Sequence, residues 1–228
     1  AYAIHQSQHE EPGEEREAAL RRALSWYLHT ADAAQAVVAP RERRVTLDPP
    51  SQDVSPRAFA DHDEAVDWSD QEHANLLAAT HAAQAAHAAG ALERLAWQLP
   101  IVHWKIRSRN APVSGWLDAG RTGLAVARRL GERAGEAELL ECLGEAYTRL
   151  NRIADSRQSH EEALTLRREL GDREGEAISL NALGLSHMHA RQLDAARHRF
   201  ERAIGLFRDL GSPWEASALA NLAFVRYQ

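Results

Sequence analysis

Histidine is the residue type in this sequence best suited to hold a metal ion, and the chain contains 12 histidines. A protein metal site needs several ligands that converge on one point. His187 and His189 are two residues apart on an expected helix, so they point to different sides of it. His81 and His87 are also out of helical register. His62, between acidic residues, reads as a polar helix start rather than a ligand, and we predict no metal site.

Cys142 is the only cysteine and therefore the only candidate thiol nucleophile. It precedes Leu143 in the apolar pattern of an expected helix, which favours a small core residue over a reactive one. No G-x-S-x-G, H-E-x-x-H, phosphate-binding loop or G-x-G-x-x-G sequence occurs. Because no set of side chains suggests a reaction, we predict that this segment is not an enzyme and binds no cofactor.

The charge pattern argues against contact with nucleic acid. The formal net charge is −6, and the arginines alternate with acidic residues instead of forming a basic stripe. No apolar run approaches the roughly 18 residues of a membrane span. The single cysteine favours a reducing compartment, so we predict a cytoplasmic location. The sequence starts at Ala1 without methionine and stops inside an expected helix at Gln228, and we expect it to be part of a longer protein.

The first 70 residues predict a helix, a proline-rich connector and a short helical turn. Apolar residues recur at helical spacing over residues 14–38, and Pro40 ends that helix. Four prolines between residues 40 and 57 predict an extended connector, whose basic cluster (Arg41, Arg43 and Arg44) favours a solvated loop. Residues 61–68 predict a helical turn. Further helices are expected over residues 71–88, capped by Asp70, and over residues 91–108 and 114–130.

One sequence pattern then recurs. The run Leu-Gly-Asp/Glu-Arg-x-Gly-Glu-Ala occurs at Leu130 and again at Leu170, 40 residues later, and a shortened copy follows Leu210. A fixed period of this size predicts stacked helical repeats. The expected helices cover residues 136–150, 153–170, 176–190 and 193–210, with another from 215.

The pattern resembles the tetratricopeptide repeat (TPR). Leu140, Leu143, Gly144 and Tyr147 have its spacing, and the small residue allows two helices to approach closely. Ser156 and His160 depart from it, since alanine and an aromatic residue are expected there. The resemblance implies an all-α fold: a right-handed α-solenoid of TPR-like hairpins with a period of about 40 residues, after the N-terminal helix and connector.

A TPR solenoid presents the first helix of each hairpin on one face, and the resemblance assigns a partner-binding surface there. The implied surface residues begin acidic and become apolar along the chain, which suits a protein or peptide segment with basic and hydrophobic anchors. They are Glu141, Glu145, Arg149, Asn181, Leu185, Met188, His189 and Phe224.

Arginines also recur at the helix ends, as Arg128, Arg168 and Arg208. Two interpretations stay open for them: a ladder that binds an anionic ligand, or residues that complement the negative end of each helix dipole. The second is favoured, because cations are commonly stabilising at that end.

The front of the chain carries a second resemblance, through Ser25-Trp-Tyr-Leu-His-Thr-Ala-Asp-Ala-Ala34, Trp68-x-x-x-Glu72-His73 and Ala96-Trp97-Gln98-Leu99. These residues resemble AfsR-like antibiotic regulatory proteins of actinobacteria (the large SARP class), which have an NB-ARC/STAND-type nucleotide switch followed by a TPR sensor. The resemblance implies a non-catalytic sensor that binds a protein partner or holds the switch inactive. ATP or ADP is implied only for an upstream domain. The alternative is a general interaction scaffold or oligomerisation module unrelated to transcription.

The predicted domains follow from these elements. Residues 1–70 form an N-terminal part that packs on the array, and residues 71–228 form the array itself. Within the array we expect degenerate units over 71–130, clear repeats over 131–170 and 171–210, and a truncated unit over 211–228.

Overall fold

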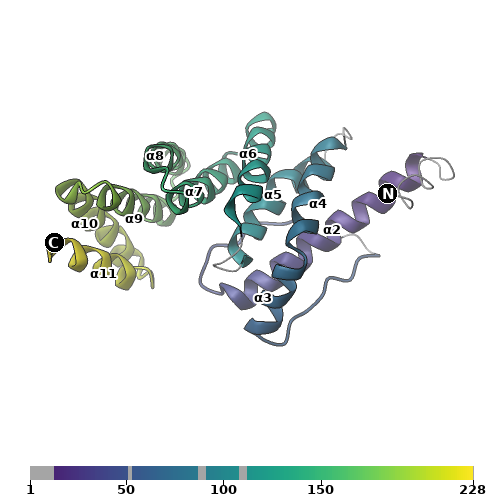
Figure 1. Ribbon diagram of the computed structural model, residues 1–228, viewed down its shortest axis with the longest axis horizontal. Coiled ribbons are helices and arrows are strands. Elements are labelled where there is room, and N and C mark those ends of the chain that lie inside the picture. The colour runs from purple at the N-terminus through teal and green to yellow at the C-terminus, as the bar shows by residue number, and fades with distance from the viewer. Residues whose placement is uncertain (1–12, 51–52, 87–90, 108–111, 228) are drawn as a thin grey trace. The chain divides into compact units, whose positions relative to one another are not determined.

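The computed structural model describes residues 13–50, 53–86, 91–107 and 112–227, and all of its regular secondary structure over these ranges is helical. The chain divides into two compact units, residues 1–112 and 113–228 (Figure 1). The predicted all-α, TPR-like helical solenoid is confirmed, since the helices pack in sequence order against their neighbours.

The first unit contains four helices among its described residues: α2 (Gly13–Val38), α3 (His62–Gln71), α4 (His73–Ala85) and α5 (Ala91–Ile106). α2 packs against α3 and α5, and α4 packs against α5. Apolar residues one helical turn apart, such as Leu24, Leu28 and Ala31 on α2, are buried here. The tryptophans Trp68, Trp97 and Trp104 enlarge this core.

The described residues of the connector between α2 and α3 form no helix or strand, and polar bonds tie them to the helices. Nε2 of Gln35 donates to the Arg43 carbonyl at 3.1 Å, and the Arg57 amide donates to Oγ1 of Thr30 at 3.1 Å. Arg44 forms an ion pair with Asp32 on α2. One arginine of the predicted basic cluster therefore helps to anchor the connector.

The second unit is a run of six helices: α6 (Val113–Leu130), α7 (Arg133–Arg149), α8 (Ile153–Glu169), α9 (Arg173–His189), α10 (Leu193–Leu210) and α11 (Glu215–Arg226). We call α7 with α8 the first hairpin, and α9 with α10 the second hairpin. Both have 17-residue first helices with identical register, Arg133 corresponding to Arg173. The sequence repeat therefore appears directly as a structural repeat.

The turns between hairpins explain the repeated glycines. Gly131, Gly171 and Gly211 have φ of 70°, 68° and 61°, the left-handed conformation that glycine adopts without a Cβ clash. The turns inside the hairpins use Asn151 (φ 57°) and Arg191 (φ 58°) instead. Glycine after each second helix is thus a helix-ending signal, as the sequence pattern indicates.

One detail differs from the sequence-based expectations. Asp70 does not cap the helix after it, because it lies inside α3, and α4 begins at His73 without a side-chain cap from Glu72. Asp61 is the residue that caps a helix, accepting a bond from the Glu64 amide at 2.9 Å. The boundary between the two compact units lies between Pro112 and Val113, within the predicted array, and the predicted domain division at residue 70 stays a prediction.

Candidate functional site

The first helices of successive hairpins lie next to one another in the second unit. Oγ of Ser179 on α9 donates to Oε2 of Glu141 on α7 at 3.0 Å, and Nδ2 of Asn221 on α11 donates to Oδ1 of Asn181 at 3.1 Å. We use the name A surface for a set of partly or fully exposed side chains on α7, α9 and α11. Its members are Glu145, Thr148, Arg149, Ile178, Asn181, Leu185, Met188, His189, Phe224 and Tyr227.

The structure places the predicted partner-binding residues in three environments. Glu145, Arg149, His189 and Phe224 are exposed; Asn181, Leu185 and Met188 are half-buried; Glu141 is buried. Seven of the eight therefore keep some accessible surface. Glu141 has almost none, and its carboxylate faces the interior of the array.

The apolar part of the A surface lies on α9 and α11. Ile178, Leu185 and Met188 pack against the core of the second hairpin but remain partly exposed. Phe224 is 54% exposed, although it is a large apolar side chain. Contiguous exposed apolar patches are common at sites that bind other proteins, and these side chains are the apolar candidates on the A surface.

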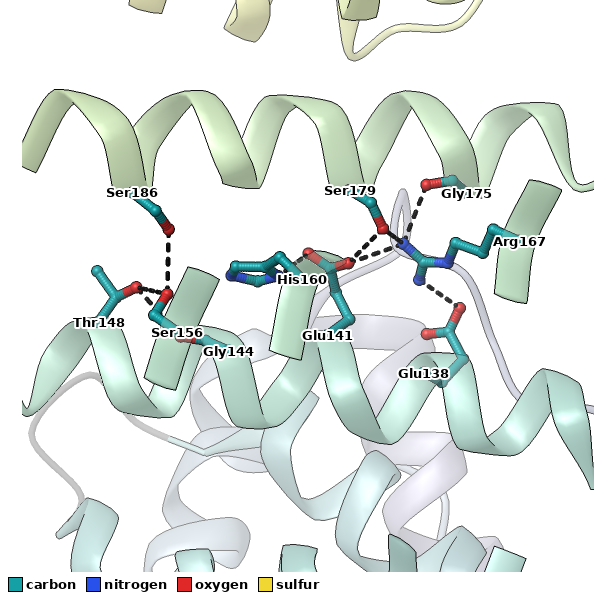
Figure 2. Close-up of polar contacts among 10 residues, drawn as sticks. All are labelled: Glu138, Glu141, Gly144, Thr148, Ser156, His160, Arg167, Gly175, Ser179 and Ser186. Atoms are coloured by element: carbon teal, nitrogen blue, oxygen red, sulfur yellow. Dashed lines mark hydrogen bonds and ion pairs between the residues drawn. The ribbon is translucent and has the colours of Figure 1, made fainter. Parts of the chain in front are cut away.

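At the α7 end of the surface, the structure contains a buried ion network that the sequence did not predict. Arg167 on α8, 1% exposed, reaches between α7 and α9 (Figure 2). Its Nη1 donates to Oε2 of Glu141 at 2.8 Å, to Oγ of Ser179 at 2.8 Å and to the Gly175 carbonyl at 3.0 Å. Its Nη2 donates to Glu138 at 3.1 Å. One guanidinium group thus joins three helices.

The charges in this network hold each other ionised. Burial raises the pKa of the Glu141 carboxyl, but the neighbouring His160 and Arg167 side chains and the bond from Ser179 outweigh it and lower that pKa to about 2. Burial likewise lowers the pKa of Arg167, while Glu141 and Glu138 raise it above its ordinary value. Both groups are therefore charged at neutral pH, in a place where an unpaired charge would be costly.

His160 combines a packing role with a polar one. A Cβ at Gly144 would overlap the His160 ring, just as a Cβ at Gly184 would overlap the Phe200 ring. His160 therefore occupies the aromatic position of the repeat. Its Nδ1 also lies 3.2 Å from Oε1 of Glu141, an ion-pair distance without the alignment of a hydrogen bond.

Hydroxyl groups continue the polar interior toward the other end of α8. Oγ of Ser156 lies 2.7 Å from Oγ1 of Thr148 and 3.1 Å from Oγ of Ser186 (Figure 2). Ser156 stands where the TPR pattern has alanine. Both departures of the first hairpin from that pattern, Ser156 and His160, therefore belong to one row of polar contacts between α7, α8 and α9.

The comparison with known families fits this arrangement. Residues 135–209 match the family model described as Tetratricopeptide repeat. The matched residues run from α7 through α10, so the two hairpins are a TPR region. Repeats of this class generally serve as protein-interaction scaffolds rather than catalysts. The search of curated proteins found no match to the chain.

Each arginine of the predicted ladder forms an ion pair with the helix that follows its own helix. Nε of Arg168 lies 2.8 Å from Glu176 of the next first helix. Arg128 pairs with Glu136 at 2.7 Å in the same way, and Arg208 with Glu215 at 2.9 Å. These repeated ion pairs favour a structural role over binding of an anionic ligand. The sequence itself indicates this structural role, because the glutamate partner of each arginine recurs in the repeat together with that arginine.

Two histidines meet in the first unit, outside the TPR region. Nδ1 of His73 lies 2.9 Å from Nε2 of His103, and burial lowers the pKa of His103 to about 3, helped by nearby His73 and Arg107. No group of three metal-ligating side chains gathers in the described ranges. In those same ranges, no helix combines the length and apolar character needed to cross a membrane.

Proposed function

We propose that this chain is a non-catalytic sensor and interaction module of a signal-transducing transcriptional regulator. Its A surface captures a protein or peptide segment, or holds an adjoining nucleotide switch inactive. The observation that carries the proposal is a set of apolar side chains that stay accessible: Leu185 and Met188 on α9, within the TPR region, and Phe224 on α11, the helix that follows it. A binder that shifts the packing of the array would bias the switch between two states.

The chemistry of the A surface defines the expected segment. The α7 end carries one exposed acidic and one exposed basic side chain, Glu145 and Arg149, while α9 and α11 offer apolar side chains and the amide of Asn181. A segment with an apolar anchor complements the α9 and α11 part of the surface. Binding energy at such surfaces concentrates in a few central residues, and Met188 and Phe224 are the best placed to supply it.

The regulatory part of the proposal is supported by the sequence resemblance of residues 25–34, 68–73 and 96–99 to AfsR-like regulators. The structure buries Trp68 and Trp97 from these motifs in the core of the first unit, so the resemblance lies in residues that shape the fold. The test is the reading frame upstream of Ala1. A phosphate-binding loop and winged helix there support the proposal, and a natural protein that begins at Ala1 contradicts it.

Peptide selection tests the binding part. We would select a random phage-displayed peptide library on the whole chain and measure the selected peptides by fluorescence anisotropy. Met188→Ala combined with Phe224→Ala should weaken binding about tenfold or more, equivalent to about 1.4 kcal/mol, with unchanged helicity. The matched control is Leu170→Ala with Leu210→Ala, which removes exposed leucines outside the A surface. Equal binding by both double variants would contradict the assignment.

A further inference from the structure

Part of the connector in the first unit lies against α2 and α5, and we call this part, residues 43–48, the strap. Residues 43–50 contain no turn or bend. Within the strap, residues 43, 45 and 47 are half-buried, whereas residues 44, 46 and 48 are exposed. An alternation with a period of two is typical of an extended chain that has one side against the protein. The strap therefore lies on the helices as an extended peptide would.

Polar side chains of the two helices hold the main chain of the strap. The Arg43 carbonyl accepts bonds from Nε2 of Gln35 on α2, at 3.1 Å, and from Nζ of Lys105 on α5. Nε2 of Gln98 on α5 donates to the Thr46 carbonyl at 3.4 Å. Gln35 and Gln98 are only 0% and 3% exposed, so both amides are buried where they meet the strap. Bonds to main-chain carbonyls do not depend on the side chains of the bound segment.

The strap runs antiparallel to α5 and matches the spacing of its contacts there. Arg43 meets Lys105, and Oδ2 of Asp48 lies 3.4 Å from Nη1 of Arg94. Arg94, Gln98 and Lys105 are four and seven residues apart, which places them on one face of the helix. The helix rises about 16 Å from Arg94 to Lys105 at about 1.5 Å per residue, and five extended residues cover about the same length. This helix face is therefore spaced to hold an extended segment.

The side chains of the strap define which segment fits. Nε of Arg44 donates to Oδ1 of Asp32 on α2 at 3.0 Å. At the other end of the strap, the carboxylate of Asp48 lies beside a guanidinium group of α5. Between these charges, Val45 and Leu47 are half-buried apolar residues. The complementary segment therefore has the order basic, apolar, any residue, apolar, acidic.

The strap leaves one buried acceptor of its site without a partner. Oε1 of Gln35 has no hydrogen-bond partner among the described residues, although Nε2 of the same amide donates to the strap. A buried acceptor that stays unbonded is costly. A side-chain amide can hold a peptide through both of its groups, since the nitrogen donates to a carbonyl and the oxygen accepts from an N–H. A segment that supplies this N–H would bind the site better than the strap does.

We propose that α2 and α5 form a docking site for an extended segment of a partner protein, and that the strap occupies this site until the partner displaces it. The partner segment has the order basic, apolar, any residue, apolar, acidic, and a main-chain N–H of it bonds to Oε1 of Gln35. Because the strap is tethered beside the site, it competes with the partner at a high effective concentration. The site belongs to the first unit and the A surface to the second, so this proposal does not rest on the function proposed above.

The strap itself supplies the probe for a binding test. We call the Val45→Asp, Leu47→Asp variant the released chain, because its own strap no longer fits. A fluorescein-labelled peptide of residues 41–50 should bind the released chain at least about tenfold more tightly than the native chain, as measured by fluorescence anisotropy. Asp32→Asn in the released chain should weaken this binding about tenfold. Asp67→Asn, at an exposed position of α3, is the matched control and should leave binding unchanged.

Peptide selection on the released chain tests the class of partner. Phage-displayed peptides should converge on the order basic, apolar, any residue, apolar, acidic, and the strap peptide should displace them. Gln35→Leu in the released chain should weaken the selected peptides about threefold to tenfold more than it weakens the strap peptide, because only the selected peptides bond to Oε1.

A second variant keeps the test independent of a folding defect in the released chain. Arg44→Glu with Asp48→Arg reverses both end charges of the strap and keeps its apolar residues, and circular dichroism checks the helicity of both variants. Three results would overturn the proposal: no binding of the strap peptide to either variant, a selected consensus without the predicted order, or a dimer of the native chain that Val45→Asp with Leu47→Asp dissociates. The last result would identify the strap of a second copy as the occupant.

Discussion

In the second hairpin, Phe200 and Phe207 fill the space beside α9; in the first hairpin, His160 and Arg167 stand at the same positions, 40 residues earlier. All four side chains are buried. Both hairpins keep a small residue, Gly144 or Gly184, beneath the ring. One helical framework therefore accepts two kinds of interior, one apolar and one ionic.

The difference shows what each interior requires. An aromatic interior needs only side chains that fill the space, since apolar area removed from water stabilises it at about 25 cal/mol per Å². An ionic interior needs every partner in place, because the desolvation of Arg167 is offset only while Glu141, Glu138 and Ser179 surround it. The first hairpin should therefore be far more sensitive to single substitutions of polar residues.

Removal of Arg167 is the largest expected effect. Arg167→Met leaves Glu141 buried without the guanidinium group that donates to it, and should lower the free energy of unfolding by about 3–5 kcal/mol. The matched control is Arg168→Met, one residue later, whose exposed ion pair with Glu176 should cost about 0.2–1 kcal/mol. Urea unfolding of the whole chain followed by circular dichroism measures both. Similar losses in the two variants would contradict the distinction between the interiors.

Acid should weaken the first hairpin through Glu141. Its pKa is about 2 in the folded chain and 4.5 ordinarily, so the unfolded chain binds more protons between these values. The stabilisation is complete above pH 4.5 and is lost as pH falls toward 2, by at most about 3 kcal/mol. Glu141→Gln should be less stable than the native chain at pH 6. That gap should close by pH 2, as measured by urea unfolding, and a constant gap would contradict the assignment.

The sequence predicts more of the fold than of the candidate site. The 40-residue spacing of Gly131 and Gly171 predicts the hairpins because glycine ends a helix through local backbone geometry. Glu141 was predicted on the partner-binding surface from its repeat position alone. The structure turns it inward because Arg167, 26 residues later, lies opposite it. The available signal was a charged residue, Arg167, at the position of Phe207.

The claim that one helical framework accepts either interior is tested most directly by replacing the ionic interior with an apolar one. His160→Phe and Arg167→Phe copy the second hairpin, Ser179→Ala copies Ala218, and Glu141→Leu removes the remaining buried charge. We predict that this fourfold variant is as stable as the native chain within about 1 kcal/mol, or more stable, by urea unfolding. A loss as large as that of Arg167→Met alone would contradict the account, because it would show that the framework of the first hairpin depends on its ions.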